Sequence, residues 1–421
     1  TGGSYLISAL KELEKEVTAC INCGFCEAVC PTFPATGYRA SMGARGRINL
    51  AKAFLEEVKE GGRSRLLVGD AFNSCLSCYA CLQVCPAGVN AGRASDYMKQ
   101  VIADGELLEK KQEHPIARMI VELTLRYRDP LGLGDRCADW ARGIEFDNDS
   151  ATILYTGHMY QLMAYNKKLR ELLNGNMELM RIGSSLITRA PALARVMRGL
   201  YDKEVKEKME NYLRNVVKLL KGAGVKFRYL GVDEPYPGTL LLDMGYVNEF
   251  ASYAKQVTDL FHEMGVKRLI VIDPHTYDIL INEYPKYVPS FDFEVIHYLD
   301  LLGSLQFKGL NGSVTYHEPC HLKRRLNYDK PLELLNKVAQ VKMPRHNGRN
   351  TMCCGGPDEA FYPKVSDNVA VLRFRELKET SASKIVTACP ICFVNLDMDG
   401  SVVDISQVLV DSLISQGEAP H

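Results

Sequence analysis

The sequence predicts an α+β protein of several domains, in which an all-helical N-terminal domain precedes two α/β domains. Apolar residues recur at helical spacing near the N-terminus, whereas the C-terminal part shows a strand, helix, strand pattern. A weaker copy of that second pattern stands earlier in the chain. With 421 residues, 46% of them hydrophobic, the chain is long enough for two or three domains, each with its own core.

The N-terminal domain is predicted over residues 1–105 from two amphipathic segments. The stretch "SYLISALKELEKEV" has helical apolar spacing, and "GARGRINLAKAFLEEV" has it too. In the second segment the apolar positions that share one face are Ile48, Ala51, Leu55 and Val58. A helical connector over residues 106–150 follows. Its lone Cys137 lies one helical turn from Trp140, and we expect both in a core.

Most of the 14 cysteines fall into three groups, which indicates ligands rather than disulfides. The runs "TACINCGFCEAVCP" and "NSCLSCYACLQVCP" both read C-x2-C-x2-C-x3-C-P. In this spacing three thiolates hold one [4Fe-4S] cube and the fourth reaches a second cube, so we expect crossed ligation in a ferredoxin-like domain. Zinc is the alternative, but it leaves half of each run unexplained. The expected sets are Cys20, Cys23, Cys26 and Cys85 for cluster 1, and Cys75, Cys78, Cys81 and Cys30 for cluster 2.

Arg45 and Arg47 lie in the predicted helix between the two runs. Both positive side chains could compensate the negative charge of a cluster or of a partner protein. Solvated residues on the outer face of a helix are the more common explanation for such charges, and we expect that here.

The third cysteine group lies in a predicted α/β domain over residues 306–421. "SVTYHEPC" and "KIVTACPIC" read as buried strands that end in turn residues, with "NVAVLRFRELKE" as a helix between them. Ligands in parallel sheets gather where strand ends meet helix starts. Five thiolates exceed what one cube requires, so an atypical cluster or a bridging thiolate is expected, with zinc as the alternative. The five are Cys320, Cys353, Cys354, Cys389 and Cys392.

Two histidines flank Cys320, and two glycines follow the adjacent cysteine pair. His317 and His321 are candidates for hydrogen bonds to sulfur, and a plain packing role is equally compatible with their positions. Gly355 and Gly356 allow the backbone to turn closely around an inorganic core.

Residues 151–305 are predicted to repeat the α/β domain without its cysteines. "RLIVIDPHTYDIL" aligns with "KIVTACPICFVNL", so that Asp273 replaces Cys389 and Thr276 replaces Cys392. Upstream, Tyr236 and Pro237 stand in the positions of the adjacent cysteine pair, followed by Gly238, and His158 stands where the first cysteine would fall. His158, Asp273 and His275 would suit a metal, but ordinary polar residues at strand ends are the simpler expectation.

An insertion over about residues 160–201 interrupts this repeat. Its stretch "MELMRIGSSLITRAPALARVMRGLY" mixes large apolar residues with arginines and has no acid after Glu178. This composition is typical of a helix in a membrane interface, and it also suits a helix packed on the protein itself or on a partner. Pro191 is expected to divide the helix. The arginines that would face headgroups or a partner are Arg181, Arg189, Arg195 and Arg198.

The paired cysteine runs followed by C…CCG…CxxC resemble the CCG-domain iron–sulfur subunits. These include the iron–sulfur subunits of heterodisulfide reductase, glycolate oxidase, lactate-utilisation proteins and anaerobic glycerol-3-phosphate dehydrogenase. The resemblance implies two CCG-type α/β domains here, the first lacking its ligands, and a non-cubane [4Fe-4S] cluster on the five C-terminal cysteines.

The resemblance also implies a function. We expect an electron-transfer subunit that links an FAD-binding dehydrogenase partner to a membrane quinone or a membrane subunit. The alternatives are a disulfide reductase that works at the CCG cluster, and a zinc-stabilised scaffold that docks other subunits.

Composition and missing motifs exclude other classes. Lys+Arg and Asp+Glu both number 51, so no overall positive field favours nucleic acid as a partner. The sequence has neither G-x-G-x-x-G after a strand nor a P-loop, so we expect no flavin in this chain. It has no apolar run approaching the roughly 20 residues that span a bilayer. The expected location is cytoplasmic, at the inner face of the cell membrane.

Overall fold

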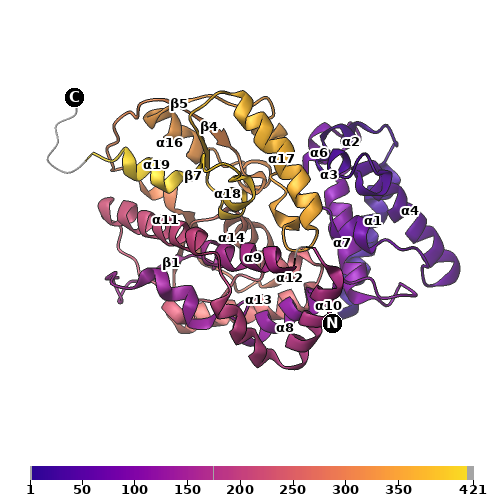
Figure 1. Cartoon of the computed structure of the whole chain (residues 1–421). Helices are drawn as coiled ribbons and strands as arrows, with labels where there is room; N and C mark the ends of the chain where they lie inside the picture. Colours follow the sequence, from indigo (N-terminus) through magenta and orange to yellow (C-terminus); the bar gives the residue numbers. More distant parts are fainter. Residues whose placement is uncertain (1, 174, 415–421) are drawn as a thin grey trace.

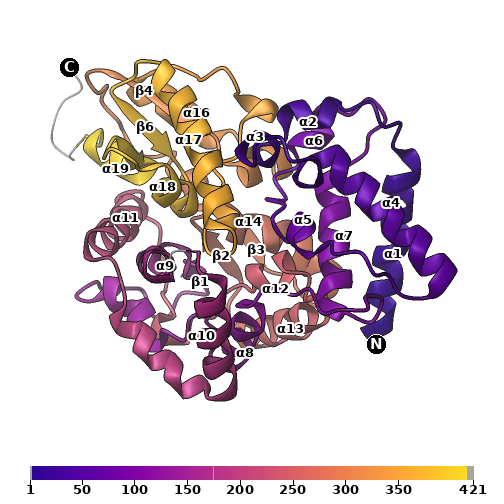
Figure 2. The ribbon, with the colours of Figure 1, turned by 45° about the vertical axis from the view of Figure 1, so that its right-hand side comes forward.

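The computed structural model describes residues 2–173 and 175–414. Its helical N-terminal domain lies beside two stacked α/β domains (Figure 1). Figure 2 shows that α17 (Pro363–Glu379) and α14 (Pro274–Asp278), one from each α/β domain, lie on the side toward the helical domain. The predicted α+β arrangement with an all-helical beginning is therefore confirmed for these residues.

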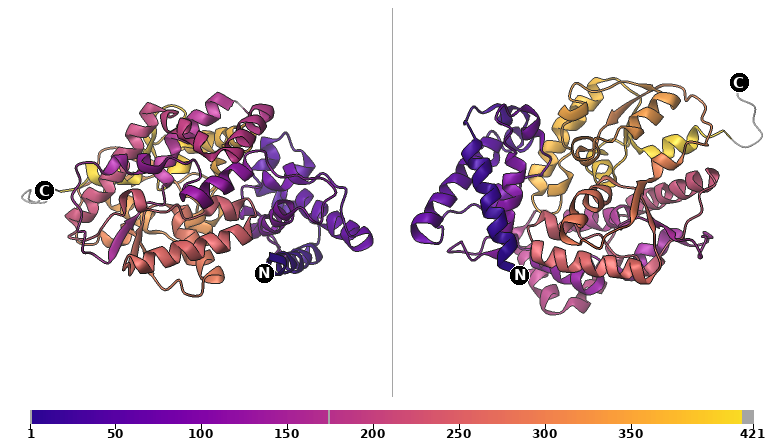
Figure 3. Two further views of the ribbon diagram at one scale, coloured as in Figure 1. Left: turned by 90° about the horizontal axis from the view of Figure 1, so that it is seen from below. Right: turned by 180° about the vertical axis from the view of Figure 1, so that it is seen from behind.

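Three long helices support the N-terminal domain. They are α1 (Gly2–Ala19), α4 (Ala44–Gly61) and α7 (Ala91–Asp104), and both predicted helices are among them. Leu13, Phe54 and Met98, one from each helix, are fully buried between them. Figure 3 shows this N-terminal domain at one side of the two α/β domains. The cysteine runs lie on short elements at one end, which are α2 (Phe25–Val29), α3 (Thr32–Ala35), η1 (Ala40–Met42), α5 (Gly69–Asn73) and α6 (Ala80–Val84).

The segment between the N-terminal domain and the first sheet is helical. It comprises α8 (Ala117–Tyr127) and the 3-10 helix η2 (Gly134–Ala141). Cys137 and Trp140 are both buried in η2, and the Trp140 indole donates a hydrogen bond to the Tyr229 hydroxyl over 3.2 Å. The expected core position of this cysteine is confirmed.

The first α/β domain has a parallel three-stranded sheet in the order β1-β2-β3. Its strands are β1 (Thr152–Tyr155), β2 (Arg268–Val271) and β3 (Glu294–His297). The longer helices around it are α9 (Met159–Leu173), α11 (Lys203–Gly222) and α13 (Val247–Glu263). The short elements are η4 (Gly231–Asp233), α12 (Thr239–Asp243), α14, η5 (Ile279–Glu283), α15 (Tyr284–Tyr287) and η6 (Tyr298–Leu301).

The second α/β domain has a parallel sheet in the order β5-β4-β6-β7. The two strands predicted to precede cysteines are β4 (Ser313–His317) and β6 (Lys384–Thr387), which pair directly, and the helix predicted between them is α17. The other elements are η7 (His321–Arg325), α16 (Lys330–Val338), β5 (Gln340–Val341), η8 (Gly348–Asn350), η9 (Gly356–Asp358), α18 (Pro390–Leu396), β7 (Val402–Asp404) and α19 (Ile405–Asp411).

The two α/β domains share details of backbone that their sequences only hint at. Gly238 and Gly355 each stand directly before a short helix. Both glycines have a left-handed backbone, with φ values of 86° and 83°. Asp273 and Cys389 are both extended N-cap residues of helices that follow a strand and begin with proline. The side chain that accepts the capping hydrogen bond is a carboxylate in the first domain and a thiol in the second. The two helices therefore begin with the same backbone conformation but with different capping groups.

The insertion is shorter than expected. Helix α9 packs against α11 in the core of the first domain, so it belongs to the fold rather than to an appended segment. The amphipathic part is α10 (Met177–Arg189) followed by the 3-10 helix η3 (Pro191–Gly199), and both lie over α8. The helix breaks at Pro191, as predicted, because proline cannot continue the hydrogen-bond ladder.

Candidate metal centres

The four cysteines expected for cluster 1 line a single pocket. Cys20, Cys23 and Cys26 come from the loop before α2 and its first turn, whereas Cys85 follows α6 of the other run. The loop curls because Asn22 and Gly24 have left-handed φ values of 57° and 87°. The structure thus brings together residues from both runs in the crossed combination.

The four cysteines expected for cluster 2 line a second pocket. Cys75, Cys78 and Cys81 come from the loop before α6 and from α6 itself, and Cys30 arrives from the end of α2. Ser77 and Tyr79 have left-handed φ values of 47° and 56°. They occupy the positions that Asn22 and Gly24 hold in the first run, so both loops have the same curled backbone.

Both pockets suit an iron–sulfur cube by the chemistry of their donors. The Val89 amide donates a hydrogen bond to the Cys85 sulfur over 3.2 Å. The Gly92 amide donates one to the Cys81 sulfur over 3.3 Å. Burial raises the pKa of the Cys26 thiol to about 11, and the Glu27 carboxylate adds to this. Thiolates in such a setting require a cation to hold them deprotonated, which iron supplies.

Arg47 differs from the expectation of a solvated residue, because it is completely enclosed beside the second pocket. It donates hydrogen bonds to the Ala71 carbonyl over 2.5 Å and the Thr32 hydroxyl over 3.0 Å, and lies 3.8 Å from the Cys30 sulfur. Its charge is buried near the thiols of Cys75 and Cys30 and the Asp358 carboxyl. Arg45 stays at the surface, where it pairs with Glu27 over 2.9 Å and lines the first pocket.

All five cysteines of the third group are buried. Cys320 lies three residues after β4, Cys389 caps α18, and Cys392 lies in the first turn of that helix. Gly355 and Gly356 let the adjacent pair fit. A β-carbon on Gly355 would lie 2.7 Å from the Ser366 carbonyl oxygen, and one on Gly356 would lie 2.2 Å from Ile391. The expected role of these two glycines in close backbone approach agrees with this geometry.

The adjacent thiols contact each other and also have different further neighbours. The Cys353 thiol is within hydrogen-bonding reach of Cys320 and also of Cys78 from the N-terminal domain. The Cys354 sulfur lies with Cys392 and His317, and the ligand atoms of these three residues are within 4.8 Å of one another. The five thiols form one chain of contacts, which ends on a cysteine of the second pocket.

The two flanking histidines have different neighbours. His317 accepts a hydrogen bond at Nδ1 from the buried Arg373 over 3.0 Å, which leaves Nε2 free to face sulfur. His321 instead pairs through Nδ1 with Asp278 over 2.7 Å. His317 is therefore the histidine placed for a hydrogen bond to sulfur.

Basic residues after Cys320 hold the second cysteine loop. Arg324 donates to the Cys78 carbonyl and Arg325 to the Ser77 carbonyl, each over 2.6 Å. Lys99 donates to the Cys75 carbonyl over 2.8 Å. These contacts were not predicted, although the run Lys323, Arg324, Arg325 directly after a ligand-type cysteine was a visible signal in the sequence.

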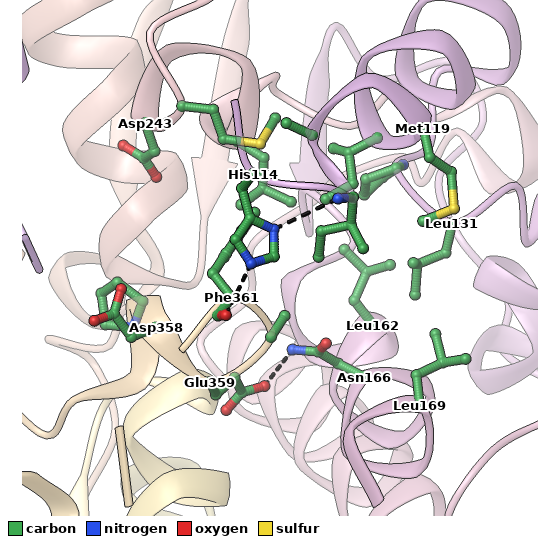
Figure 4. A pocket seen from close by; sticks show the side chains of 18 of the residues that line it. His114, Met119, Leu131, Leu162, Asn166, Leu169, Asp243, Asp358, Glu359 and Phe361 are labelled. Atoms are coloured by element: carbon green, nitrogen blue, oxygen red, sulfur yellow. Dashed lines mark hydrogen bonds between the residues drawn. The ribbon is translucent and has the colours of Figure 1, made fainter. Parts of the chain in front are cut away.

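A cavity of about 360 Å³ lies where the three domains meet, and it was not predicted. Cys75, Gly356 and Ile391 border it, so it adjoins both the second pocket and the five-cysteine site. Figure 4 shows Asp358 and Glu359 at one end and leucine and methionine side chains at the other. Much of the apolar lining comes from α8, α9, α10 and η3, namely Ile116, Met119, Ile120, Leu162, Met163, Leu169, Met180, Ile187, Leu193 and Met197.

The former ligand positions of the first α/β domain hold no cluster-type arrangement among the described residues. Asp273 accepts hydrogen bonds from the amides of His275 and Thr276, both over 2.9 Å, as a helix cap. His275 stacks on His321 with ring centroids 4.1 Å apart. His158 lies instead beside Cys137 and Asp129.

Comparison with known families identifies both cysteine regions. The family described as "4Fe-4S dicluster domain" matches residues 16–89, and the family described as "Cysteine-rich domain", CCG, matches residues 314–397. The chain therefore contains a 4Fe-4S dicluster domain and a cysteine-rich CCG domain. The α/β domain that carries the five cysteines is thus a CCG domain.

Several curated proteins resemble the chain. The dihydromethanophenazine:CoB–CoM heterodisulfide reductase of Methanosarcina barkeri has a subunit that is 23% identical over 95% of this chain and 92% of that protein. A probable membrane-anchored ferredoxin from Chromohalobacter salexigens is 25% identical over 90% of this chain. The EtfAB:quinone oxidoreductase of Syntrophomonas wolfei is 31% identical over 42% of this chain. The chain spans 56% of that ferredoxin and 27% of that oxidoreductase.

Among the described residues, no helix is both long and apolar enough to cross a bilayer.

Proposed function

We propose that this iron–sulfur chain is the electron-transfer subunit that connects an FAD-binding dehydrogenase to a membrane quinone. The contact between Cys78 and Cys353 carries the proposal, because it joins the second ferredoxin-type pocket to the CCG site within one chain. Cys20, Cys23, Cys26 and Cys85 would hold cluster 1, and Cys75, Cys78, Cys81 and Cys30 would hold cluster 2. Cys320, Cys353, Cys354, Cys389 and Cys392 would hold the non-cubane cluster.

The clusters, when bound, supply one-electron redox chemistry, and the protein sets their spacing and potentials. Arg324 and Arg325 fix the loop of cluster 2 against the CCG domain through its carbonyls. Asn368 donates to the Ala35 carbonyl over 2.7 Å and adds a second contact between these domains. These contacts keep the two sites at a constant separation, which a relay requires.

The cavity is the proposed site for the quinone. It adjoins Cys75 and Gly356, the glycine two residues after Cys354 in the CCG domain. Its apolar walls suit the ring and the hydrophobic tail of a quinone. Reduction of a quinone to a quinol takes two electrons and two protons. Asp358 and Glu359 are buried acids at the polar end, and each has one carboxylate oxygen without a partner among the described residues. Burial raises the pKa of Glu359 to about 7, so a proton is available there near neutral pH.

The outer side of α10 and η3 is the proposed membrane contact. Its apolar side chains are exposed to solvent, which defines the insertion face as Leu179, Ile182, Leu186, Leu193 and Val196. Arg189 and Arg195 are exposed on the same segment and make no ion pair among the described residues. Leu179, Leu193 and Val196 also line the cavity, so a molecule could pass from this face to the interior.

Two of the four predicted arginines have other partners. Arg198 donates to the Gly132 carbonyl over 3.2 Å and pairs with Asp135 over 3.3 Å, so it holds η3 to the connector rather than facing outward. Arg181 is exposed but pairs with Glu178 over 2.6 Å. The charge available for lipid headgroups on this segment is therefore concentrated on Arg189 and Arg195.

The proposal is tested by anaerobic purification of the chain from its native host with its partners. A co-purifying flavoprotein, and reduction of the clusters by lactate, glycolate or glycerol 3-phosphate seen by EPR, is the expected result. Subsequent reoxidation by a soluble quinone analogue completes the test. Absence of flavin together with cluster reoxidation by a disulfide substrate would overturn the proposal and favour a disulfide reductase. The cavity borders Gly356 of the five-cysteine site, so a disulfide substrate bound there would also lie beside that site.

Replacing Arg47 with glutamine is expected to lower the reduction potential of cluster 2 by an amount on the order of tens of millivolts. A buried cation beside Cys30 favours the more negative, reduced cluster, so its loss disfavours reduction. The potential is measured by EPR-monitored titration. Arg47→Lys, which keeps the charge, is the control. A potential that is unchanged in Arg47→Gln, with the cluster intact, would contradict the assignment.

Replacing both Arg189 and Arg195 with glutamine is expected to weaken binding to anionic vesicles. Each arginine near such a surface contributes about 1 kcal/mol, so the double variant loses about 2 kcal/mol, or about 30-fold in affinity. Vesicle co-sedimentation at constant ionic strength measures this. The matched control is Arg65→Gln with Arg345→Gln, two exposed arginines outside the insertion. Equal losses in both double variants would show that general charge, not this face, determines binding.

A further inference from the structure

A second cluster of metal-type ligands lies outside the cysteine sites. Asp129 follows α8, Cys137 lies in η2, and His158 lies between β1 and α9. The Cys137 sulfur is 3.3 Å from the Asp129 Oδ2, and one ligand atom of each of the three residues lies within 4.8 Å of the others. All three side chains are more than nine-tenths buried. The connector and the first α/β domain thus meet at a group of sulfur, nitrogen and oxygen donors.

His158 is the observation that points to a ligand. Neither of its ring nitrogens has a hydrogen-bond partner within residues 2–173 and 175–414, although the ring is only 4% exposed. Buried polar groups are ordinarily paired, and an imidazole leaves both a donor and an acceptor unsatisfied here.

A further buried carboxylate lies beside this group of ligands. Glu234 is buried beside this group, and its Oε2 lies 3.9 Å from the His158 Nε2. The Glu234 carboxylate accepts hydrogen bonds from the Thr156 hydroxyl over 2.7 Å and the Gly157 amide over 3.2 Å. Hydrogen bonds therefore satisfy this carboxylate, and the His158 ring, which is unpartnered among the described residues, is what points to a metal.

We propose that Asp129, Cys137 and His158 bind one zinc ion, with Glu234, whose Oε2 lies 3.9 Å from the His158 Nε2, as the candidate fourth ligand. Zinc accepts thiolate, imidazole and carboxylate ligands together in a tetrahedral site, and binding would release the Cys137 proton. His158 occupies the place three residues after β1 that Cys320 occupies after β4. The first α/β domain therefore keeps a ligand at this position, but takes its other ligands from the connector instead of from a CCG loop.

The zinc ion would fasten the connector to the sheet. Asp129 also accepts backbone hydrogen bonds from Leu131 over 2.7 Å and Leu133 over 3.0 Å, which shapes the loop that carries the thiol toward β1. Because this site shares no residue with the three cysteine groups, the proposal stands apart from the electron-transfer function.

The metal content of the whole chain, purified anaerobically, tests the proposal. We expect about one zinc per chain in addition to the iron, by analogy with four-ligand structural sites. His158→Ala and Cys137→Ser are each expected to lose the zinc while iron content and cluster absorption stay unchanged. Cys389→Ser is expected to lose iron and keep the zinc. A zinc that disappears in Cys389→Ser and persists in Cys137→Ser would place it at the CCG site and overturn the proposal.

A measurement on the unmodified chain covers the case in which the variants fail to fold. X-ray absorption at the zinc edge is expected to show a single sulfur neighbour, with nitrogen and oxygen completing the shell. Four sulfur neighbours, or a chain without zinc after growth in zinc-supplemented medium, would refute the site.

Discussion

Replacing Cys85 with alanine is expected to remove cluster 1, although the other three proposed ligands belong to the other cysteine run. Cys85 lines the pocket with Cys20, Cys23 and Cys26, and no other cysteine lines that pocket. With three clusters of four irons, the variant should lose about one third of its iron. Cys30→Ala should remove cluster 2 in the same way. Iron analysis and EPR of the dithionite-reduced protein measure both losses.

The matched control for these variants is Cys137→Ala, a buried cysteine outside all three groups. It should keep the iron content of the unmodified protein. If Cys85→Ala lost the cluster of its own run, with the EPR signal of cluster 1 intact, ligation would be local and the crossed arrangement would be refuted.

Filling the cavity by Gly183→Trp is expected to abolish electron transfer to quinone while leaving all clusters in place. Gly183 lines the cavity, and a β-carbon there would meet nothing within 4 Å, so the indole can be added to α10 without a backbone clash. The large side chain then occupies space that the quinone needs. We expect the rate of quinone reduction to fall roughly tenfold or more, since a blocked pocket loses its binding energy outright.

Gly199→Trp is the control, because it adds the same side chain to the end of η3, where a β-carbon also meets nothing within 4 Å and where the residue does not line the cavity. Cluster reduction by dithionite should be normal in both variants. An unaltered quinone rate in Gly183→Trp would exclude this cavity as the acceptor site, whereas failure of the flavin partner to reduce the clusters would instead count against the relay as a whole.

Sequence spacing was sufficient for the local features of this protein. The helices α1, α4 and α17 and the strands β4 and β6 follow from apolar periodicity, which reports the burial of one face at a time. The C-x2-C-x2-C-x3-C-P pattern predicted that Cys30 and Cys85 each join the three cysteines of the other run. The reason is that the proline after the fourth cysteine directs its thiol away from the other three. The family resemblance rested on the same cysteines, and the two family matches cover both regions.

Expectations about individual charges were less successful. Arg47 and Arg198 both have the sequence context of surface residues, yet one is enclosed beside Cys30 and the other holds η3 to the connector. Helical periodicity predicts on which face of a helix a residue lies. It does not predict which other element packs against that face. The extent of the insertion was overestimated for the same reason, because only packing against α11 shows that α9 belongs to the core.

The fold class, the proposed cysteine ligand sets and the presence of a CCG domain could all be predicted from the sequence, because they depend on residues close together in the chain or on repeated spacing. Which of these sites adjoin one another depends on the packing of the three domains. The contact of Cys78 with Cys353, the cavity bordered by Cys75 and Gly356, and the group of Asp129, Cys137 and His158 all join segments far apart in sequence. No periodicity records such proximity, since it arises when separate hydrophobic faces are buried against one another.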